Sequence, residues 1–253
     1  MNISACIITN NNHKVLDAIK SVYDSVSEII LVNTCEDFTI DLTEYDKVKL
    51  YSFDWCDDFS KARNYSISKA TGDWILIIDS DDILQGKIKY IDKRFTHYLF
   101  PVINNGNNIS YTERLFKNDK NIFFVNKAHE KLTGVSKENE CTVNDLVIIH
   151  SGYDDAETSK AKIERNLRII ETDYENDLRD YYLTNLYYQV DRLSEAVECG
   201  VKVLNSDVNE CYKISVAVTI AYILDLKNSI HNVNEIQNKI KEIENVSTAG
   251  VYC

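Results

Sequence analysis

The first 150 residues alternate short apolar runs with amphipathic segments. Buried strands are predicted at four apolar runs, residues 3–9, 28–33, 47–53 and 73–79. Two segments between them, residues 13–24 and 57–72, repeat apolar side chains every three to four positions, as amphipathic helices do. Asp57 or Asp58 is placed to cap the second helix, and Gly72 to end it. Apolar strands that alternate with helices indicate an α/β sandwich with a mainly parallel sheet.

The pattern changes after about residue 95. Four apolar runs follow without helices between them, at residues 97–104, 109–117, 121–126 and 141–150, and they predict a mixed or antiparallel extension of the sheet. From Glu157 onward only helical periodicity remains, with helices predicted at residues 157–175, 178–190, 193–205, 210–226 and 231–244. The chain is therefore expected to form a first domain of residues 1–152 and an all-α C-terminal domain of residues 153–253.

One helical pair in the C-terminal domain has the spacing of a tetratricopeptide repeat. Leu183, Tyr187 and Ala196 occupy its small and apolar positions, whereas Gly200 stands where the repeat prefers an aromatic residue. No second clean copy follows. Ordinary helical hairpins that close the domain fit the pattern equally well, and both interpretations stay open.

Composition excludes some classes of partner. The chain has 253 residues, 44% of them hydrophobic, and a formal net charge of −12, which argues against nucleic acid or an anionic membrane as a main partner because both attract a basic face. No stretch approaches the roughly 18 apolar residues of a membrane span, and the N-terminal residues lack the basic region of a signal peptide. Seven cysteines without a CxxC pair are read as reduced thiols in a cytoplasmic protein.

The stretch "DWILIIDSDD", residues 73–82, begins as a buried strand and ends in acids. Ligands of open parallel sheets collect at the carboxyl ends of the strands, where Asp79, Ser80, Asp81 and Asp82 stand. Carboxylates suit Mg²⁺ or Mn²⁺. In an extended stretch Asp79 and Asp81 point the same way and Asp82 points elsewhere, so the first two are expected to share a ligand. The alternative is an Asp-rich turn that caps a following helix, and an isolated acid pair would favour that alternative.

Several other motifs before and after this acidic stretch contain residues that could act together with it. "FSKARN" contains Arg63 and Asn64 on the preceding helix, and a helical Arg beside an acidic strand end forms either a structural salt bridge or a bidentate contact with an anionic ligand. The later motifs are "RLF" (114–116), "AHE" (128–130) and "IIHSGY" (148–153). His150 ends an apolar strand, where its imidazole could complete a metal shell, although a single histidine is more often structural.

In their order, "IITNNN", "FSKARN", "DSDD", "RLF", "AHE" and "IIHSGY" resemble glycosyltransferase family 2, the inverting enzymes with the GT-A fold for nucleoside-diphosphate sugars. The resemblance covers about residues 2–170. It is nearest to bacterial members with tetratricopeptide-like C-termini, which include the sublancin-type peptide S-glycosyltransferases that modify bacteriocins.

The resemblance implies roles for the residues at the acidic strand end. Asp81 would ligate the divalent cation, Mg²⁺ or Mn²⁺. Asp79 would approach the donor ribose or the metal shell, with Ser80 beside it. His150 would be the third protein ligand or a diphosphate contact.

The resemblance also implies a nucleotide pocket at the ends of the first two strands. Thr9 and Asn11 would line this pocket, and Arg63 and Asn64 would lie on its flank. The family usually has Asp at the end of the second strand to accept the uracil imide proton. This chain has Asn33 there, whose side-chain oxygen can accept that hydrogen bond without a charge.

The resemblance predicts an inverting transfer of sugar from a UDP-sugar to a peptide or protein side chain, with a cysteine thiol among the candidate acceptors. Glu130 is the best candidate for the general base, with His129 next, and a structural His–Glu pair is the alternative. Adjacent strand residues face opposite ways, so only one of the two faces the site unless "KAHEKL" is a loop. Three other hypotheses stay open: a cell-surface glycan or lipid-linked acceptor, a catalytically degenerate peptide-binding scaffold, and a homodimer through the helical tail.

Overall fold

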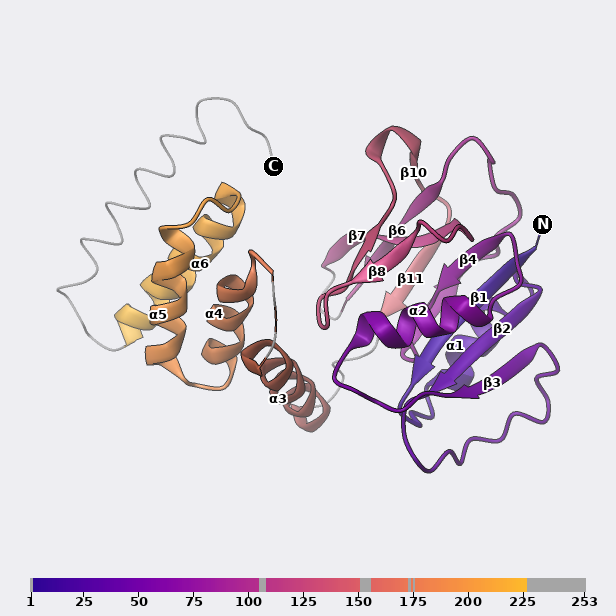
Figure 1. The fold of residues 1–253 in the computed structure, drawn as a ribbon, viewed down its shortest axis with the longest axis horizontal. Helices are drawn as coiled ribbons and strands as arrows, with labels where there is room; N and C mark the ends of the chain where they lie inside the picture. Colours follow the sequence, from indigo (N-terminus) through magenta and orange to yellow (C-terminus); the bar gives the residue numbers. More distant parts are fainter. Residues whose placement is uncertain (1, 105–107, 151–155, 173, 175, 227–253) are drawn as a thin grey trace. The chain divides into compact units, whose positions relative to one another are not determined.

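The computed structural model describes residues 2–104, 108–150, 156–172, 174 and 176–226 (Figure 1). It separates into two compact units, Met1–Ser159 and Lys160–Cys253. The predicted boundary between residues 152 and 153 lies outside the described residues and stays a prediction.

The first unit is built on a nine-stranded mixed sheet. Eight strands follow the spatial order β3-β2-β1-β4-β7-β6-β11-β5, and β10 pairs with β6. Their bounds are β1 Ile3–Thr9, β2 Glu28–Asn33, β3 Val48–Ser52, β4 Trp74–Ile77, β5 Asp82–Gln85, β6 His97–Ile103, β7 Ile109–Lys117, β10 Glu140–Thr142 and β11 Val147–His150. The strands β3, β2, β1 and β4 are parallel, whereas β7 is antiparallel to both β4 and β6. The α/β sandwich with a mainly parallel mixed sheet is therefore confirmed.

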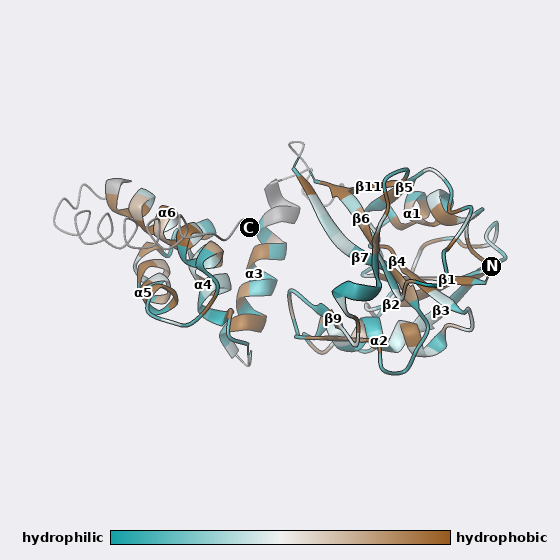
Figure 2. Cartoon of the chain, turned by 90° about the horizontal axis from the view of Figure 1, so that it is seen from above, coloured by the Kyte–Doolittle hydropathy of each residue, from teal (hydrophilic) through white to brown (hydrophobic). Residues whose placement is uncertain are grey.

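Helices cover both faces of the parallel half of the sheet. Figure 2 shows α1 (Val15–Val22) and α2 (Phe59–Lys69) on opposite sides of the strands. Alternate residues of β1 point to each side: Ile3, Ala5 and Ile7 pack in the cluster that includes α1, and Cys6 packs in the other cluster, near α2. Burial on both faces explains why the strands read as continuous apolar runs rather than as alternating ones.

Two short strands lie outside the main sheet. They are β8 (Phe123–Val125) and β9 (Lys131–Thr133), which pair antiparallel. Phe124 and Leu132 pack in the same apolar cluster as the α2 face of the sheet. The sequence pattern predicted β8 but not the three-residue β9, because so short a strand carries no periodicity.

The acidic stretch is a turn and not an extended strand end. β4 ends at Ile77, and the backbone N–H of Asp82 donates to the carbonyl of Asp79 at 3.0 Å, closing a turn after which β5 begins at Asp82. β5 then pairs antiparallel with β11, so that His150 stands opposite Asp82. The expectation that Asp82 points away from the other acids is therefore wrong, since it assumed an extended backbone through residues 79–82.

Two other local predictions have definite outcomes. Asp58 caps α2, accepting the backbone N–H of Lys61 at 3.0 Å, as one of the two predicted caps. The predicted strand at residues 141–150 is two strands, β10 and β11, which both pair with β6. Residues 143–146 between them are not in a strand.

The second unit is helical. Its helices are α3 (Ala156–Thr172, which begins in the first unit), α4 (Arg179–Gln189), α5 (Leu193–Leu204) and α6 (Glu210–Leu226), close to four of the five predicted ranges. The fifth, residues 231–244, lies outside the described residues. A Cβ added at Gly200 would stand 2.6 Å from Ile220 Cδ1 and 2.9 Å from Val216 Cγ1, so glycine allows α5 and α6 to pack closely. Among the described helices, none combines the length and apolarity of a membrane span.

Candidate active site

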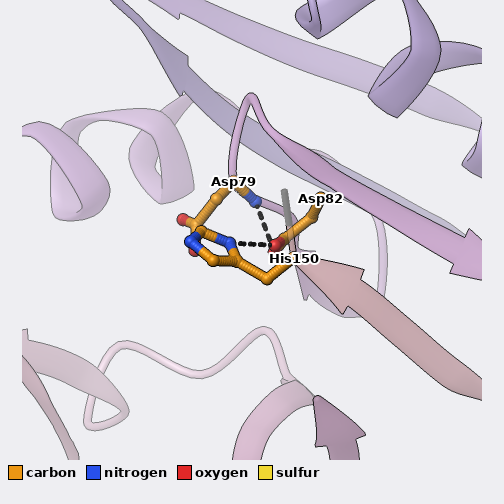
Figure 3. Close-up of side chains that lie close together, drawn as sticks. All are labelled: Asp79, Asp82 and His150. Atoms are coloured by element: carbon orange, nitrogen blue, oxygen red, sulfur yellow. Dashed lines mark hydrogen bonds and ion pairs between the residues drawn. The ribbon is translucent and has the colours of Figure 1, made fainter. Parts of the chain in front are cut away.

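Three polar side chains meet at one edge of the main sheet. Asp79 follows β4, Asp82 begins β5 and His150 ends β11, and each offers one ligand atom within 4.8 Å of the others (Figure 3). His150 Nδ1 lies 2.7 Å from Asp82 Oδ1, and the backbone N–H of Asp79 donates to Asp82 Oδ2 at 3.0 Å. Two carboxylates and an imidazole form a donor set that suits a divalent cation.

Asp82 contacts the other residues at this edge of the sheet. It is fully buried, and its two carboxylate oxygens contact His150 and the Asp79 backbone, with Arg114 Nη2 3.2 Å from Oδ2. Sequence reasoning left Asp82 without a role. The signal that finds it is the antiparallel β5–β11 pairing, which depends on residues 68 positions apart.

Asp81 lies beside the cluster. Its side chain is buried, and its Oδ1 is 3.7 Å from His150 Nδ1. The sequence assigned the metal to Asp79, Asp81 and His150. The structure groups Asp79 and His150 with Asp82 and places Asp81 at the margin, so a metal-binding role for Asp81 stays a prediction. Ser80, half-buried in the same turn, also stays a predicted donor contact.

Two arginines face these acids from different elements. Arg63 on α2 donates from Nη2 to Asp79 Oδ1 at 2.8 Å and from Nε to Glu130 Oε1 at 2.6 Å. Arg114 on β7 donates to Asp79 Oδ2 from Nη1 and Nη2 at 3.1 and 3.2 Å. The acids therefore have basic partners within the chain. The "RLF" motif had no residue role in the sequence analysis, and Arg114 was missed as a site residue.

A β-bulge aims Arg114 at the site. Tyr98 and Leu99 are neighbours on β6, but they pair with Leu115 and Glu113 of β7, which leaves Arg114 as the extra residue. A bulge of this kind redirects a side chain relative to the regular alternation of a strand. No sequence pattern announces it, because the register depends on the partner strand.

Burial and charge act in opposite directions on Asp79. Burial alone would raise the pKa of its carboxyl, but the guanidiniums of Arg63 and Arg114 hold that pKa well below the ordinary value. The hydrogen bond to Asp82 raises the pKa of the His150 imidazole, against the opposing effect of burial. Asp79 is therefore a carboxylate at neutral pH.

Charged groups of both signs lie close together at this edge. The carboxylates of Asp79, Asp81, Asp82 and Glu130 lie close to two guanidiniums, those of Arg63 and Arg114, and to the His150 imidazole. Several carboxylate oxygens gathered at one partly buried edge are suited to a divalent cation.

The candidate bases lie on a loop. Residues 126–130 connect β8 to β9, and two of them, Asn126 and His129, have positive φ values of 75° and 50°. The strand rule that only one of His129 and Glu130 can face the site therefore does not apply. Glu130 reaches the acidic cluster through Arg63, and the His129 side chain is exposed. A catalytic role for either residue stays a prediction.

The predicted nucleotide-pocket residues hold the adjoining loop. Thr9 and Asn33 stand opposite each other at the ends of β1 and β2. Asn33 Oδ1 accepts the Cys35 backbone N–H at 3.2 Å, and its Nδ2 donates to the Cys35 carbonyl at 2.6 Å. Asn11 holds Thr39 through a pair of hydrogen bonds of 3.0 and 3.1 Å. These residues shape the end of the sheet, and their contact with a nucleotide stays a prediction.

The Asn64 side chain is hydrogen-bonded to the backbone of Phe124. Its Nδ2 donates to the Phe124 carbonyl and its Oδ1 accepts the Phe124 backbone N–H, both at 2.8 Å. Both functional atoms of the amide are therefore used to attach α2 to β8. The predicted nucleotide contact of Asn64 would require this pair of hydrogen bonds to open.

Comparison with known proteins places the chain among glycosyltransferases. The SPbeta prophage-derived glycosyltransferase SunS of Bacillus subtilis (strain 168) is 27% identical over 220 residues, which cover 79% of this chain and 52% of SunS. A TPR repeat-containing protein of Synechococcus elongatus is 42% identical over 84 residues, 32% of this chain and 21% of that protein. The chain therefore spans about half the length of SunS and a smaller share of the Synechococcus protein.

Structures of Staphylococcus aureus TarS are similar at low identity. TarS residues 1–349 in complex with UDP-GlcNAc match with a TM-score of 0.46 and 15% identity, covering 100% of this chain and 93% of that one. A further TarS crystal structure matches with a TM-score of 0.45 and 15% identity, covering 97% of this chain and 55% of that one.

The family model of Glycosyl transferase family 2 matches residues 4–144, more than half of the chain. The matched range begins in β1, ends after β10 and contains the turn with Asp79 and Asp82, both arginines and Glu130. The chain belongs to glycosyl transferase family 2, and its first unit has the GT-A fold of that family.

Proposed function

We propose that this protein is a metal-dependent, inverting glycosyltransferase that moves a sugar from a nucleoside-diphosphate sugar, a UDP-sugar, to a peptide or protein side chain. The observation that carries the proposal is the partly buried Asp79–Asp82–His150 cluster at the sheet edge. Both acids lie within the range that matches the family, residues 4–144, and His150 follows it. A family match alone would not distinguish an active enzyme from a relative that has lost its acids.

The residues at this edge fit a divalent cation, Mg²⁺ or Mn²⁺. Carboxylate oxygens are the protein ligands that Mg²⁺ and Mn²⁺ prefer, and the imidazole nitrogen of His150 lies within reach of the same position. Asp79, Asp82 and His150, with Asp81 at the margin, would hold it. When bound, the cation supplies Lewis-acid stabilisation of the charge that develops on a leaving diphosphate.

The chain's own residues would supply the other requirements of the reaction. Arg63 and Arg114 hold the Asp79 carboxylate in one orientation, so that the donor-facing turn is organised before a ligand arrives. Glu130 would accept the proton of the acceptor group as it attacks the anomeric carbon. In a direct displacement of this kind the nucleoside diphosphate leaves from the opposite side, and the configuration at that carbon inverts.

A peptide or protein acceptor is the part of the proposal that depends on resemblance and on the helical unit. The packed helices α4, α5 and α6 belong to a class of architecture whose surfaces bind extended peptides. A cysteine thiol is a suitable acceptor, since its ordinary pKa near 8.5 leaves a few per cent thiolate at neutral pH and lessens the need for a strong base. Five cysteines are free thiols, namely Cys6, Cys35, Cys56, Cys141 and Cys199. Cys211 is disulfide-bonded, so the expectation that all seven cysteines are reduced is wrong at this position. The cytoplasmic location that we propose therefore does not rest on the cysteines.

The experiment is metal-dependent turnover with a panel of sugar nucleotides. The protein is incubated with UDP- or GDP-sugars and Mn²⁺ or Mg²⁺, with and without a library of cysteine- and serine-containing peptides, and products are identified by mass spectrometry. We expect donor hydrolysis that EDTA abolishes and a peptide mass increased by one sugar. Transfer to lipid-linked glycans but not to peptides would show that the acceptor is a glycan, while the protein would still be a glycosyltransferase.

A second candidate, a catalytically degenerate peptide-binding scaffold, is favoured by one contact. Asn33 stands where a carboxylate is usual, and its only side-chain oxygen already accepts the Cys35 N–H and lies 3.0 Å from Cys35 Sγ. A scaffold of this kind would bind peptides without hydrolysing any sugar nucleotide. Nucleotide binding with Mn²⁺, measured by calorimetry, separates the two, because a scaffold without a donor site would show no heat of UDP binding.

A further inference from the structure

Arg63 stands between two acids that the proposed reaction uses for different purposes. Its side chain is only 11% exposed, with Nη2 2.8 Å from Asp79 Oδ1 and Nε 2.6 Å from Glu130 Oε1. Asp79 follows β4 at the donor-facing turn, and Glu130 ends the β8–β9 loop, 51 positions later in the chain. One planar guanidinium thus contacts both sides of the candidate active site.

The position of this guanidinium is fixed by its surroundings. Asn64, the next residue on α2, is held by two hydrogen bonds to the Phe124 backbone, and Arg63 Cζ lies 5.5 Å from the centre of the Phe124 ring. The backbone N–H of Phe59 donates to the Lys127 carbonyl at 2.8 Å, which attaches the start of α2 to the β8–β9 loop. A buried, stacked Arg with several fixed neighbours loses little further entropy when it binds two carboxylates.

The Glu130 carboxylate is divided between two environments. Oε1 accepts the Arg63 N–H, and in the described part of the chain Oε2 has no hydrogen-bond donor. The side chain is 15% exposed. Oε1 therefore holds the carboxylate in place, and Oε2 is left to accept a proton. A base on a loop needs such a second contact, because the loop backbone alone does not position a side chain precisely enough for proton transfer.

We propose that Arg63 is a positioning residue that couples the donor side of the site to the base: it holds Asp79 and Glu130 in one arrangement, so that the Glu130 oxygen Oε2 faces the acceptor when the donor turn is in place. This inference rests on the proposed function for its kinetic consequence and on the hydrogen bonds alone for its structural one. It assigns Arg63 a role different from the nucleotide contact that the family resemblance implies.

The tested variant is Arg63→Lys. A lysine keeps the positive charge and most of the buried stem, but its single ammonium cannot donate in the fixed fork that reaches both carboxylates. The matched control is Lys61→Gln on the same helix. The Lys61 side chain is 64% exposed, and among the described residues its ion pair is with the Asp58 cap. The Asp58 cap also accepts the backbone N–H of Lys61, so the helix keeps its start in that control.

The readouts are kinetic and structural. We expect Arg63→Lys to lower kcat about 100-fold with a change of about threefold or less in donor KM, as loss of base positioning would do. In the Glu130→Gln background the same substitution should lower kcat by no more than about threefold, because a residue that acts through Glu130 has nothing left to position. Hydrogen exchange of the backbone amides of residues 126–130 should become faster in Arg63→Lys and stay unchanged in Lys61→Gln.

Each outcome has a distinct meaning. Equal losses of kcat from Arg63→Lys in the native and the Glu130→Gln backgrounds would overturn the coupling, as would unchanged exchange in residues 126–130. A large rise in donor KM with kcat unchanged would return Arg63 to the role of a donor contact. If the native protein turned over no donor while the exchange result held, the proposed function would fail and the structural coupling would stand.

Discussion

At the scale of single residues, the candidate site is a set of closely placed charges of both signs. Asp79 is neutralised by two arginines, and Asp82 is the fully buried acid that joins His150, Arg114 and the Asp79 backbone. Asp81 lies at the margin, 3.7 Å from His150, and differs from Asp82 in being slightly exposed. Substituting these two neighbouring acids should therefore have different consequences.

We expect Asp81→Asn to abolish sugar transfer and metal-dependent donor binding while leaving the melting temperature close to that of the native protein. Removing one carboxylate lowers the affinity of the edge for a divalent cation but breaks no contact of the Asp82 network. Calorimetric titration with UDP and Mn²⁺ and thermal melting check the two halves of this prediction. Full turnover of the purified variant with Mn²⁺ would show that Asp81 is no metal ligand.

Asp82→Asn is the matched comparison for that variant. It removes one carboxylate oxygen from a fully buried position that faces Arg114 and His150, so we expect a loss of about 3 kcal/mol in the free energy of unfolding. Urea unfolding measures it. Equal stability of the two variants would mean that the Asp82 contacts contribute little.

Glu130→Gln should lower kcat about 1,000-fold and change donor affinity little. The amide is nearly isosteric and can still accept the Arg63 hydrogen bond through its oxygen, but it cannot take a proton from the acceptor. Steady-state kinetics with the natural donor give both constants. An unchanged kcat would move the base to another residue, with His129 the next to test.

At the scale of elements, the sheet edge is built by pairings between distant strands. β5 is placed by β11, and Arg114 is turned toward the acids by the bulge where β6 and β7 pair. β2 lies near the other end of the strand order, next to β3 and β1. It begins at Glu28, whose buried carboxylate accepts hydrogen bonds from Ser4, Lys49 and Thr71. This cluster links β1, β2, β3 and the segment before β4 without taking part in the site.

Glu28 provides a pH-dependent test of the parallel half of the sheet. Burial alone would raise the pKa of its carboxyl, but the hydrogen bonds from Lys49, Ser4 and Thr71 outweigh burial and lower the pKa from 4.5 to about 2. A lowered pKa adds stability that is present above the unfolded-state value and disappears as the pH falls from about 4.5 towards 2. Glu28→Gln should therefore cost about 3 kcal/mol at pH 7 and progressively less below pH 4.5.

Urea unfolding of the native protein and of Glu28→Gln across pH 3 to 8 measures this difference. Glu44→Gln, at an exposed acid, makes the same change of charge and controls for the net charge of the protein. A stability difference that stays constant down to pH 3 would contradict the lowered pKa.

At the scale of the whole molecule, two units have separate cores. The clusters around β1 and β4 fill the first unit, and Val203, Val216, Ile220 and Leu224 form the core between α5 and α6 in the second. Asp79, Asp81, Asp82, Glu130, His150, Arg63 and Arg114 all belong to the first unit. Pairing of two chains through the helical tail stays a prediction.

Differential scanning calorimetry should resolve the two units. We expect UDP with Mn²⁺ at about 100 times its Kd to stabilise the first unit by about 2.7 kcal/mol and to leave the transition of the helical unit where it was. Ile220→Ala, in the fully buried core of α6, should lower only the second transition, by about 3 kcal/mol at that unit. A single transition that moves as a whole in both experiments would show that the units unfold together.

The sequence by itself determined the elements whose signals are local. Continuous apolar runs placed β1, β2 and β4, helical spacing placed α1 and α4, and the order of "FSKARN", "DSDD", "AHE" and "IIHSGY" led to the family that the family model matches. Asp79, His150 and Glu130 were named for the site, and the structure places all three at or next to the acidic edge.

Only the tertiary structure decided which charges meet. Asp82 faces His150 because a turn at residues 79–82 starts β5, Arg114 faces Asp79 through a bulge, and Arg63 bridges two acids 51 positions apart. Each contact depends on the register between distant segments, a property that the pattern within any one segment does not contain. The sequence motif also marked Asn64 as a functional residue, but its side chain holds α2 and β8 together.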